Sequence, residues 1–111
     1  MEYVENLSEP WFTLVKIGIK TVEGRLNKGR FANMNIGDIF VFTNNEFIFE
    51  RKFKIKIKNI SYHKDFQTYL ETETLEKCLP GIDTVDDGLH IYYTYYTQID
   101  ESKYTIKAFH F

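Results

Sequence analysis

The sequence lacks the features that mark secreted and membrane proteins. It has one cysteine, Cys78, which cannot form an internal disulfide, and this favours a reducing, intracellular setting, cytoplasmic or nuclear. It has no run of about 18 apolar residues, so we expect no membrane-spanning segment. The first residues, Met-Glu-Tyr-Val-Glu-Asn, are acidic and have neither the basic nor the apolar region of a signal peptide.

Patterns that bind cofactors or metals are also missing. There is no glycine-rich phosphate loop of the Walker or dinucleotide type. His63, His90 and His110 lack metal-ligand spacing with one another or with Cys78, so surface or packing roles are expected for them. Cys78 follows the apolar face of a predicted helix, which favours a buried thiol over a nucleophile. The sequence therefore predicts no metal site and no cofactor.

What is present suits one well-packed domain, residues 1–111. The length of 111 residues is close to the commonest domain size. Hydrophobic residues make up 43% of the chain, and Phe, Tyr and Trp alone make up 17%. Because each aromatic side chain buries a large apolar area, we expect a substantial core despite the small size.

Charge is divided unevenly along the chain. Residues 9–64 hold eleven Lys and Arg against five Asp and Glu, whereas residues 65–111 hold three Lys against nine Asp and Glu. The basic part can face phosphates, but the acidic part would repel a long polyanion. This favours a local ligand site over a surface that wraps duplex DNA. The alternative is that the two parts face each other and partly cancel.

The first half of the chain predicts one helix followed by strands. Ser8 is a candidate N-cap with Pro10 in the first turn, and Gly18 is a natural C-terminal stop. An extended segment is expected at 20–26, a basic turn at 27–30 and a buried strand at 39–42. Thr43-Asn44-Asn45-Glu46 predicts a hairpin turn, and alternation makes 47–62 strand-like, with one buried and one lysine-rich face.

The second half predicts helices and then a closing strand. Residues 64–79 have helical spacing, Pro80-Gly81 breaks the chain, and Thr84 caps a new helix with Asp87 three residues on. Residues 104–111 predict a last strand. Strands that flank a helical insertion indicate a compact α+β domain with a curved or closed sheet.

The segment Gly18-x-Lys20-x-x-Glu23-x-Arg25 resembles the G-x-K-x-x-E-x-R signature of the ASCH domain family. Ile36-Gly37-Asp38-Ile39 and Leu79-Pro80-Gly81 also follow in that family's order, so the resemblance covers nearly the whole chain. It implies a small PUA-like β-barrel of about five to six strands, with a short N-terminal helix and two to three helices inserted before the last strand. It also implies a module that binds RNA or a nucleotide, in RNA metabolism or translation regulation.

The signature residues that would form the site are Gly18, Lys20, Thr21, Glu23 and Arg25. In an extended segment, Glu23 and Arg25 share a face, and a turn or bulge can bring Lys20 to them. Arg offers a planar fork for phosphate or a base edge, and Glu can accept from a base or a sugar hydroxyl. The ligand expected from the resemblance is single-stranded RNA or a local nucleotide. The alternative from spacing alone is a salt-bridge cluster that stabilises the fold or a protein-interaction surface.

Whether the domain is an enzyme stays open. Some relatives resemble amidohydrolases that act on acetylated cytidine, and others are linked to RNA cleavage. Lys20 matches the lysine of the amidohydrolase branch, but Glu23 occupies its threonine position, and Leu79-Pro80-Gly81 stands where its separate glutamate is expected. If the domain is catalytic, Lys20 and Glu23 are the candidates for acid–base work.

Two surface patterns have two interpretations each. Most of the tyrosines at 92, 93, 95 and 96 suit helix packing, while one or two can line a pocket and stack on a base. The lysines at 52, 54, 56 and 58 can touch an RNA backbone, or they can be a solvated face that protects a sheet edge from aggregation.

Overall fold

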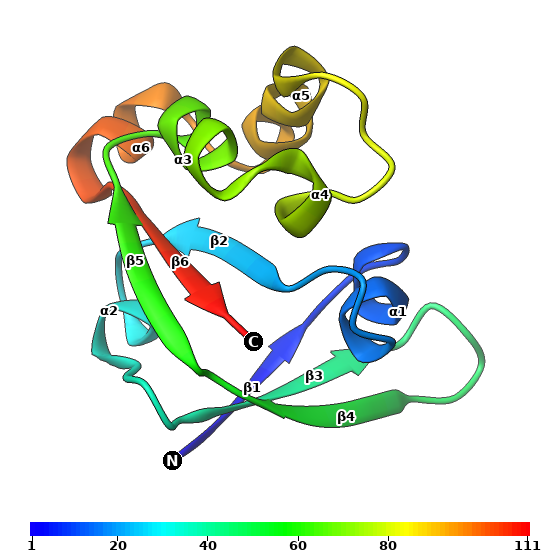
Figure 1. Cartoon of the computed structure of the whole chain (residues 1–111). Helices are drawn as coiled ribbons and strands as arrows, with labels where there is room; N and C mark the ends of the chain where they lie inside the picture. Colours follow the sequence, from blue (N-terminus) through cyan, green and yellow to red (C-terminus); the bar gives the residue numbers. More distant parts are fainter.

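Six strands form two three-stranded sheets in the computed structural model, which describes all of residues 1–111 (Figure 1). The first sheet has the order β1 (Glu2–Asn6), β3 (Ile39–Asn44), β4 (Arg51–Lys56), and the second has the order β2 (Val22–Leu26), β6 (Ile106–His110), β5 (Asn59–His63). β1 runs parallel to β3, and all other neighbours are antiparallel. The predicted α+β class is confirmed, and the six strands agree with the five to six that the family resemblance implied, although β1 was not among the strands expected from the sequence pattern.

The strands do not close into one barrel, which corrects the fold that the resemblance implied. No strand pairing joins the two sheets, and the chain passes from β4 of the first to β5 of the second through Ile57 and Lys58. There the Ile57 N–H donates to the Asp38 carbonyl at 2.9 Å, and the Lys58 N–H donates to the His110 carbonyl at 2.7 Å. Ile57 is fully buried, so this corner is fixed in the core.

Six helices accompany the sheets, and four of them, rather than the expected two to three, lie between β5 and β6. They are α1 (Trp11–Lys16), α2 (Arg30–Asn33), α3 (Phe66–Glu73), α4 (Leu75–Cys78), α5 (Val85–Tyr95) and α6 (Gln98–Tyr104). Figure 1 shows α3 to α6 as a layer over the β2-β6-β5 sheet. The predicted cap is confirmed, because the Thr84 hydroxyl accepts from the Asp87 N–H at 3.1 Å. The helix α6 was not predicted, although Thr97 caps it through the Asp100 N–H in the same way.

Two other local predictions change. Ser8 does not cap α1 with its side chain; the Glu9 carboxylate accepts from the Thr13 N–H at 2.9 Å instead. The strand-like stretch 47–62 contains two strands, β4 and β5, and Phe47 to Phe49 form an exposed loop before them. In β4 the alternation of exposed lysines with partly buried Phe53 and Ile55 is as predicted.

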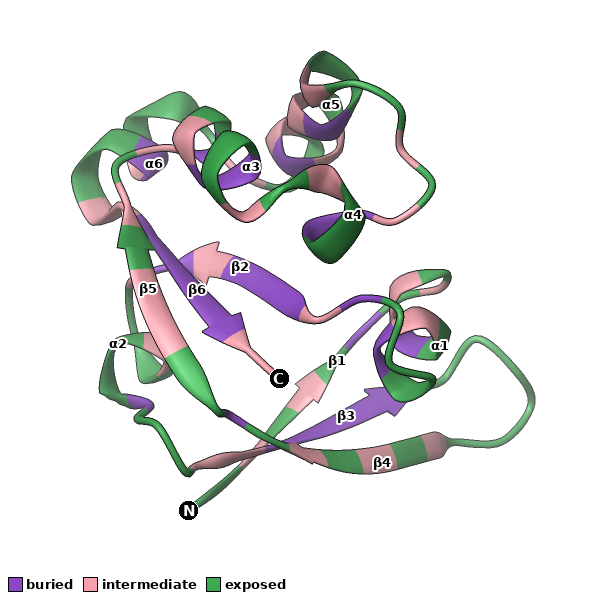
Figure 2. Ribbon diagram, in the orientation of Figure 1, coloured by how far each residue is buried: buried purple, intermediate pink, exposed green.

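The core has two parts that meet at β6 (Figure 2). One part lies between the helical layer and the β2-β6-β5 sheet, and the other lies between the two sheets. The first includes Val22, Leu26, Phe66, Tyr69, Leu70, Cys78, Leu79, Tyr92, Ile106 and Ala108. The second includes Leu7, Phe12, Val15, Met34, Phe40, Phe42, Ile57 and Phe109. The strand β2 therefore lies between the helices and the rest of the domain, which places the signature segment at the boundary of the layers.

Close packing on Gly24 fixes this strand against the helices. A Cβ atom at Gly24 would lie 2.5 Å from the Tyr69 Cζ and 2.8 Å from its hydroxyl oxygen. Tyr69 is fully buried, and its ring also packs against Phe66 and Tyr92. Only glycine permits this approach of ring to backbone.

Candidate functional site

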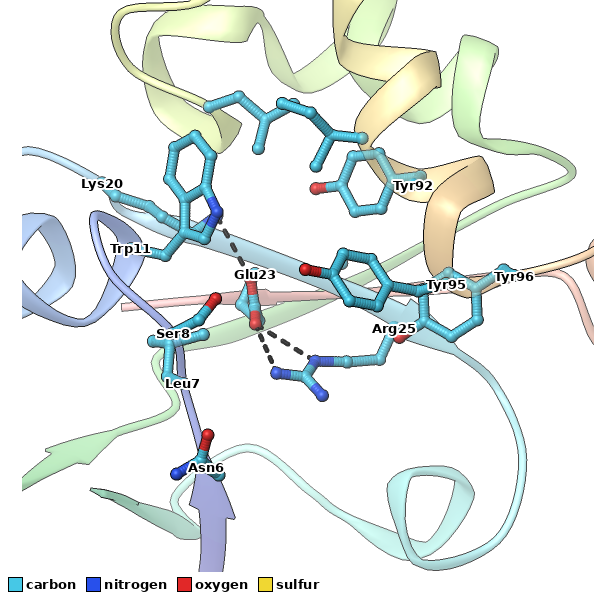
Figure 3. A pocket seen from close by; sticks show the side chains of 13 residues that line it. Asn6, Leu7, Ser8, Trp11, Lys20, Glu23, Arg25, Tyr92, Tyr95 and Tyr96 are labelled. Carbon is cyan, nitrogen blue, oxygen red and sulfur yellow. Dashed lines mark hydrogen bonds and ion pairs between the residues drawn. The ribbon is translucent and has the colours of Figure 1, made fainter. Parts of the chain in front are cut away.

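A cavity of about 260 Å³ lies where β2, the end of β1 and the helix α5 meet (Figure 3). Lys20, Glu23 and Arg25 of the signature line it, together with residues from other parts of the chain. These are Asn6, Leu7, Ser8, Trp11, Gly24, Leu79, Ile91, Tyr92, Tyr95 and Tyr96. Its volume is slightly below the range of about 300–1,000 Å³ that is usual for small-molecule sites. The cavity suits one small group rather than an extended ligand.

Lys20 lies just before β2 and is held entirely within the protein. Its side chain is 1% exposed, and Nζ contacts the Glu23 carboxylate at 3.2 Å. The same ammonium donates to the carbonyl oxygens of Val22 and Cys78. Since an ammonium has three protons, these three acceptors satisfy it completely. Lys20 therefore ties β2 to the C-terminal end of α4.

Glu23 and Arg25 continue this contact into a chain of alternating charges. The Glu23 carboxylate accepts from Arg25 Nε at 3.1 Å and from a terminal guanidinium nitrogen at 2.8 Å (Figure 3). The other terminal nitrogen of Arg25 reaches Glu5 on β1 at 3.3 Å. Arg30 pairs with the second oxygen of Glu5 at the exposed end. Three cations thus alternate with two carboxylates from the buried end to the surface.

The charges in this chain stabilise one another. Burial alone would raise the pKa of Glu23, but the Lys20 and Arg25 charges lower it below its ordinary value. Burial works to lower the pKa of Arg25, yet the Glu23 carboxylate raises it. Glu23 is therefore an ionised acceptor held between two cations at neutral pH.

Aromatic side chains form two sides of the cavity. Figure 3 shows Trp11 on one side and Tyr92, Tyr95 and Tyr96 on the other. Tyr92 is buried, whereas Tyr95 is 71% exposed and makes no hydrogen bond within the protein through its hydroxyl. Burial, and then the Glu23 charge, raise the pKa of Tyr92 well above its ordinary value, so its hydroxyl stays protonated. A flat ring that enters the cavity can stack on the aromatic side chains of either wall.

The structure thus brings together three of the five predicted site residues. Gly18 and Thr21 do not line the cavity. Gly18 ends the α1 turn with a φ of +81°, and the Thr21 N–H donates to the Lys77 carbonyl at 3.1 Å. Tyr93 does not line the cavity either, and its hydroxyl donates to Glu101 at 2.9 Å.

Sequence reasoning missed the partners that complete the site. Asn6, Ser8 and Glu5 come from the N-terminal strand region, and Trp11 was interpreted only as an apolar helix position. Their sequence positions carry no local signal for a site, since strand pairing and helix packing bring them to β2. The tyrosine repeat was the one available signal, and three of its four members line the cavity.

A second polar cluster lies apart from the cavity, on β5, β6 and α3. His63 Nε2 lies 2.7 Å from the Glu73 carboxylate, and Ser61 donates to the same oxygen at 2.6 Å. His110 Nε2 lies 2.9 Å from the Ser61 oxygen. Two histidines that looked unrelated in sequence therefore meet. No group of three His, Cys, Asp or Glu side chains is arranged to hold a metal ion.

The model of the ASCH domain family matches residues 6–111, which include the whole signature segment. The chain belongs to the ASCH domain family. The crystal structure of hypothetical protein PH0355 is similar to this ASCH domain with a TM-score of 0.88 and 31% identity, over 99% of this chain and 96% of that one.

A second solved structure, the solution NMR structure of protein PF0455 from Pyrococcus furiosus, has a TM-score of 0.80 and 30% identity to this ASCH domain, over 99% of this chain and 94% of that one. No curated protein matches the sequence. No helix of this ASCH domain is long and apolar enough to cross a membrane.

Proposed function

We propose that this ASCH domain binds RNA or a nucleotide, and that the cavity beside β2 receives one base or nucleoside of a single strand. The observation that carries the proposal is the arrangement of Arg25 and Glu23 between aromatic walls. Proteins that bind single strands stack unpaired bases on Tyr, Phe or Trp rings and hydrogen-bond their edges. The cavity volume of about 260 Å³ is compatible with one such group.

Arg25 is the signature residue with hydrogen-bonding capacity left for a ligand. A guanidinium has three nitrogen atoms that carry five N–H donors in total. In Arg25 each nitrogen uses one N–H group to donate to Glu23 or Glu5. Two further N–H groups, one on each terminal nitrogen, do not bond to Glu23 or Glu5, and the Tyr96 hydroxyl at the cavity lies close enough to interact with this guanidinium. They can donate to a base carbonyl or a phosphate oxygen at the cavity. Glu23 orients the guanidinium, and Lys20 holds Glu23.

The geometry gives less support to a hydrolase or a ribonuclease. Lys20 donates all of its protons to acceptors within the protein, and Glu23 is held ionised by two cations. Neither group is poised to exchange a proton with a substrate. Thr21, the nearest hydroxyl in the signature, does not line the cavity. The arrangement of these side chains therefore favours ligand binding over catalysis.

A purely structural role for the ion pairs is the remaining alternative, and ligand titration separates the two. Trp11 is the sole tryptophan and lines the cavity, so its fluorescence reports occupancy directly. We expect nucleoside monophosphates or short single-stranded RNA to change Trp11 emission in a saturable way. The binding proposal fails if none of them does so at millimolar concentration.

Tyr95→Ala tests the stacking wall with little risk to the fold, because Tyr95 is mostly exposed. Stacking contributes about 1–3 kcal/mol per base, so affinity should fall roughly 5- to 150-fold. Tyr62→Ala is the matched control, since Tyr62 is 60% exposed and lies on β5 outside the cavity. Equal affinity for the wild type and both variants would remove the stacking role.

A further inference from the structure

We infer that an RNA strand with a base in the cavity continues across the outer face of the β1-β3-β4 sheet, where Lys52, Lys54 and Lys56 bind its phosphates. This inference rests on the proposed function, because it extends the same bound strand. These three residues of β4 form a second contact region, the lysine column.

The lysine column is an evenly spaced, solvent-exposed row of cations. The three lysines alternate along β4 with partly buried residues, so they project from one face about 7 Å apart. Lys52 and Lys56 make no ion pair, and Lys54 pairs only with the exposed Glu2 at 3.0 Å. An exposed pair of this kind is weak, so a phosphate can replace the carboxylate. Arg51 differs, because Glu9 and Asn44 hold its guanidinium.

The strand register connects this column to the cavity. Asn6, which lines the cavity, pairs with Thr43 of β3, and Thr43 pairs with Lys52 of β4. Directly paired residues share a face of a sheet, so Asn6 and Lys52 project to the same side. Two strand spacings separate them, or about 10 Å. A single strand leaving the cavity past Asn6 therefore reaches Lys52 within a short path.

The charge distribution favours an RNA path from the cavity over the β1-β3-β4 sheet rather than over the helices. All nine acidic residues of the segment 65–111 fall from Asp65 to Glu101, a range that includes α3, α4, α5 and the first half of α6. Those helices lie on the other side of β2 from the β1-β3-β4 sheet (Figure 1). Phosphates that ran over the helical layer would meet carboxylates, whereas phosphates on the sheet meet the lysine column. The uneven charge along the sequence therefore places most of the acidic residues of the segment 65–111 on the helical layer and the lysine column on the β1-β3-β4 sheet.

The test is the salt dependence of RNA binding by the triple variant K52Q/K54Q/K56Q. A labelled single-stranded RNA of about twelve nucleotides, within the usual site sizes, is titrated by fluorescence anisotropy at several salt concentrations. Each phosphate contact on a single strand adds about 0.7 to the slope of log K against log salt. Loss of three contacts should reduce the slope by about 2 and the affinity in 0.1 M salt by roughly 100-fold.

The control is K64Q/K77Q/K103Q, which changes the net charge equally but alters exposed lysines of the segment that contains the helical layer. Its slope should stay near that of the wild type. Equal losses in both triple variants, or no loss in either, would overturn the inference and leave an edge-protecting role for the lysines.

A mononucleotide separates this inference from the proposed function. It is too short to reach the lysine column, so its effect on Trp11 emission should be the same in the wild type and in K52Q/K54Q/K56Q. If the mononucleotide binds and the RNA slope is unchanged in the variant, the inference fails while the proposed function stands. If neither the mononucleotide nor the RNA binds the wild type, the proposed function fails first.

Discussion

Glu23→Gln removes the charge that neutralises two buried cations, and we expect it to destabilise the domain strongly. Glu23 lies 3.2 Å from Lys20 Nζ and 2.8 Å from Arg25, and Lys20 is only 1% exposed. Removing one partner of a buried pair typically costs about 3–5 kcal/mol, because the other charge stays buried without compensation. Domains of this size have about 5–15 kcal/mol of stability in total. The melting temperature should therefore fall by at least about 10 °C.

The opposite end of the same ion-pair chain supplies the comparison. Arg30 is 47% exposed and pairs with Glu5, and exposed pairs contribute about 0–1 kcal/mol. Urea denaturation of the wild type, Glu23→Gln and Arg30→Gln should give a large loss for the first variant and a small one for the second. A loss below about 1 kcal/mol for Glu23→Gln would refute the reasoning that these charges depend on one another.

The contribution of Glu23 to folding stability should decrease as pH falls. Although burial favours protonation, the Lys20 and Arg25 charges lower the pKa of Glu23 in the folded protein. Its contribution to stability is therefore present above the unfolded pKa of about 4.3 and is lost as pH falls through the lower folded value. Below pH ~4.3 the wild type should lose stability more steeply than Glu23→Gln, which has no carboxylate to titrate at this position. If stability fell with pH to the same extent in the wild type and in Glu23→Gln, the lowered pKa of Glu23 would be contradicted.

Three further predictions concern the surroundings of the site. Gly24→Ala should cost about 3 kcal/mol by overpacking against Tyr69, and Tyr69→Leu in the same chain should recover part of it; a neutral Gly24→Ala would be inconsistent with the close approach. Burial raises the pKa of Cys78 to about 11, so iodoacetamide should label it at neutral pH only after unfolding, and rapid labelling of the folded domain would argue against the buried thiol. Thr84→Ala should lower stability by about 1 kcal/mol through loss of the α5 cap, as measured by urea denaturation; no change would mean that the cap is not needed.

Local signals in the sequence predicted much of the fold. The Thr84 cap, the apolar run at 39–42 and the alternation along β4 each depend on residues close in sequence, and each is confirmed. The strand β1 was missed because it forms by pairing with β3, more than 30 residues away, and because its five residues mix the strand formers Tyr3 and Val4 with Glu and Asn, which are depleted in strands. The division into two sheets depends on pairing between strands that are far apart in the sequence, such as β2 with β6, and no local pattern marks those partners.

Contacts between distant segments were also what the sequence could not predict at the candidate site. Spacing predicted that Glu23 and Arg25 share a face, but not that Lys20 would be buried and satisfied by backbone carbonyls. Lys107 is a second example, since it donates to the carbonyl oxygens of Phe31 and Met34. A lysine normally favours the surface, and only the folded arrangement of acceptors makes burial of these two possible. The sequence identified the charged groups, whereas their partners come from the tertiary fold.

Mapping of a bound nucleoside monophosphate by ¹H–¹⁵N NMR tests the central claim most directly. We expect saturable shifts at the Trp11 indole N–H, the Gly24 amide and the Arg25 side chain, because all three residues line the cavity. The largest shifts should therefore cluster at the meeting point of β2 and α5. Shifts confined to other parts of the domain, or none at millimolar ligand, would contradict a binding role for this cavity.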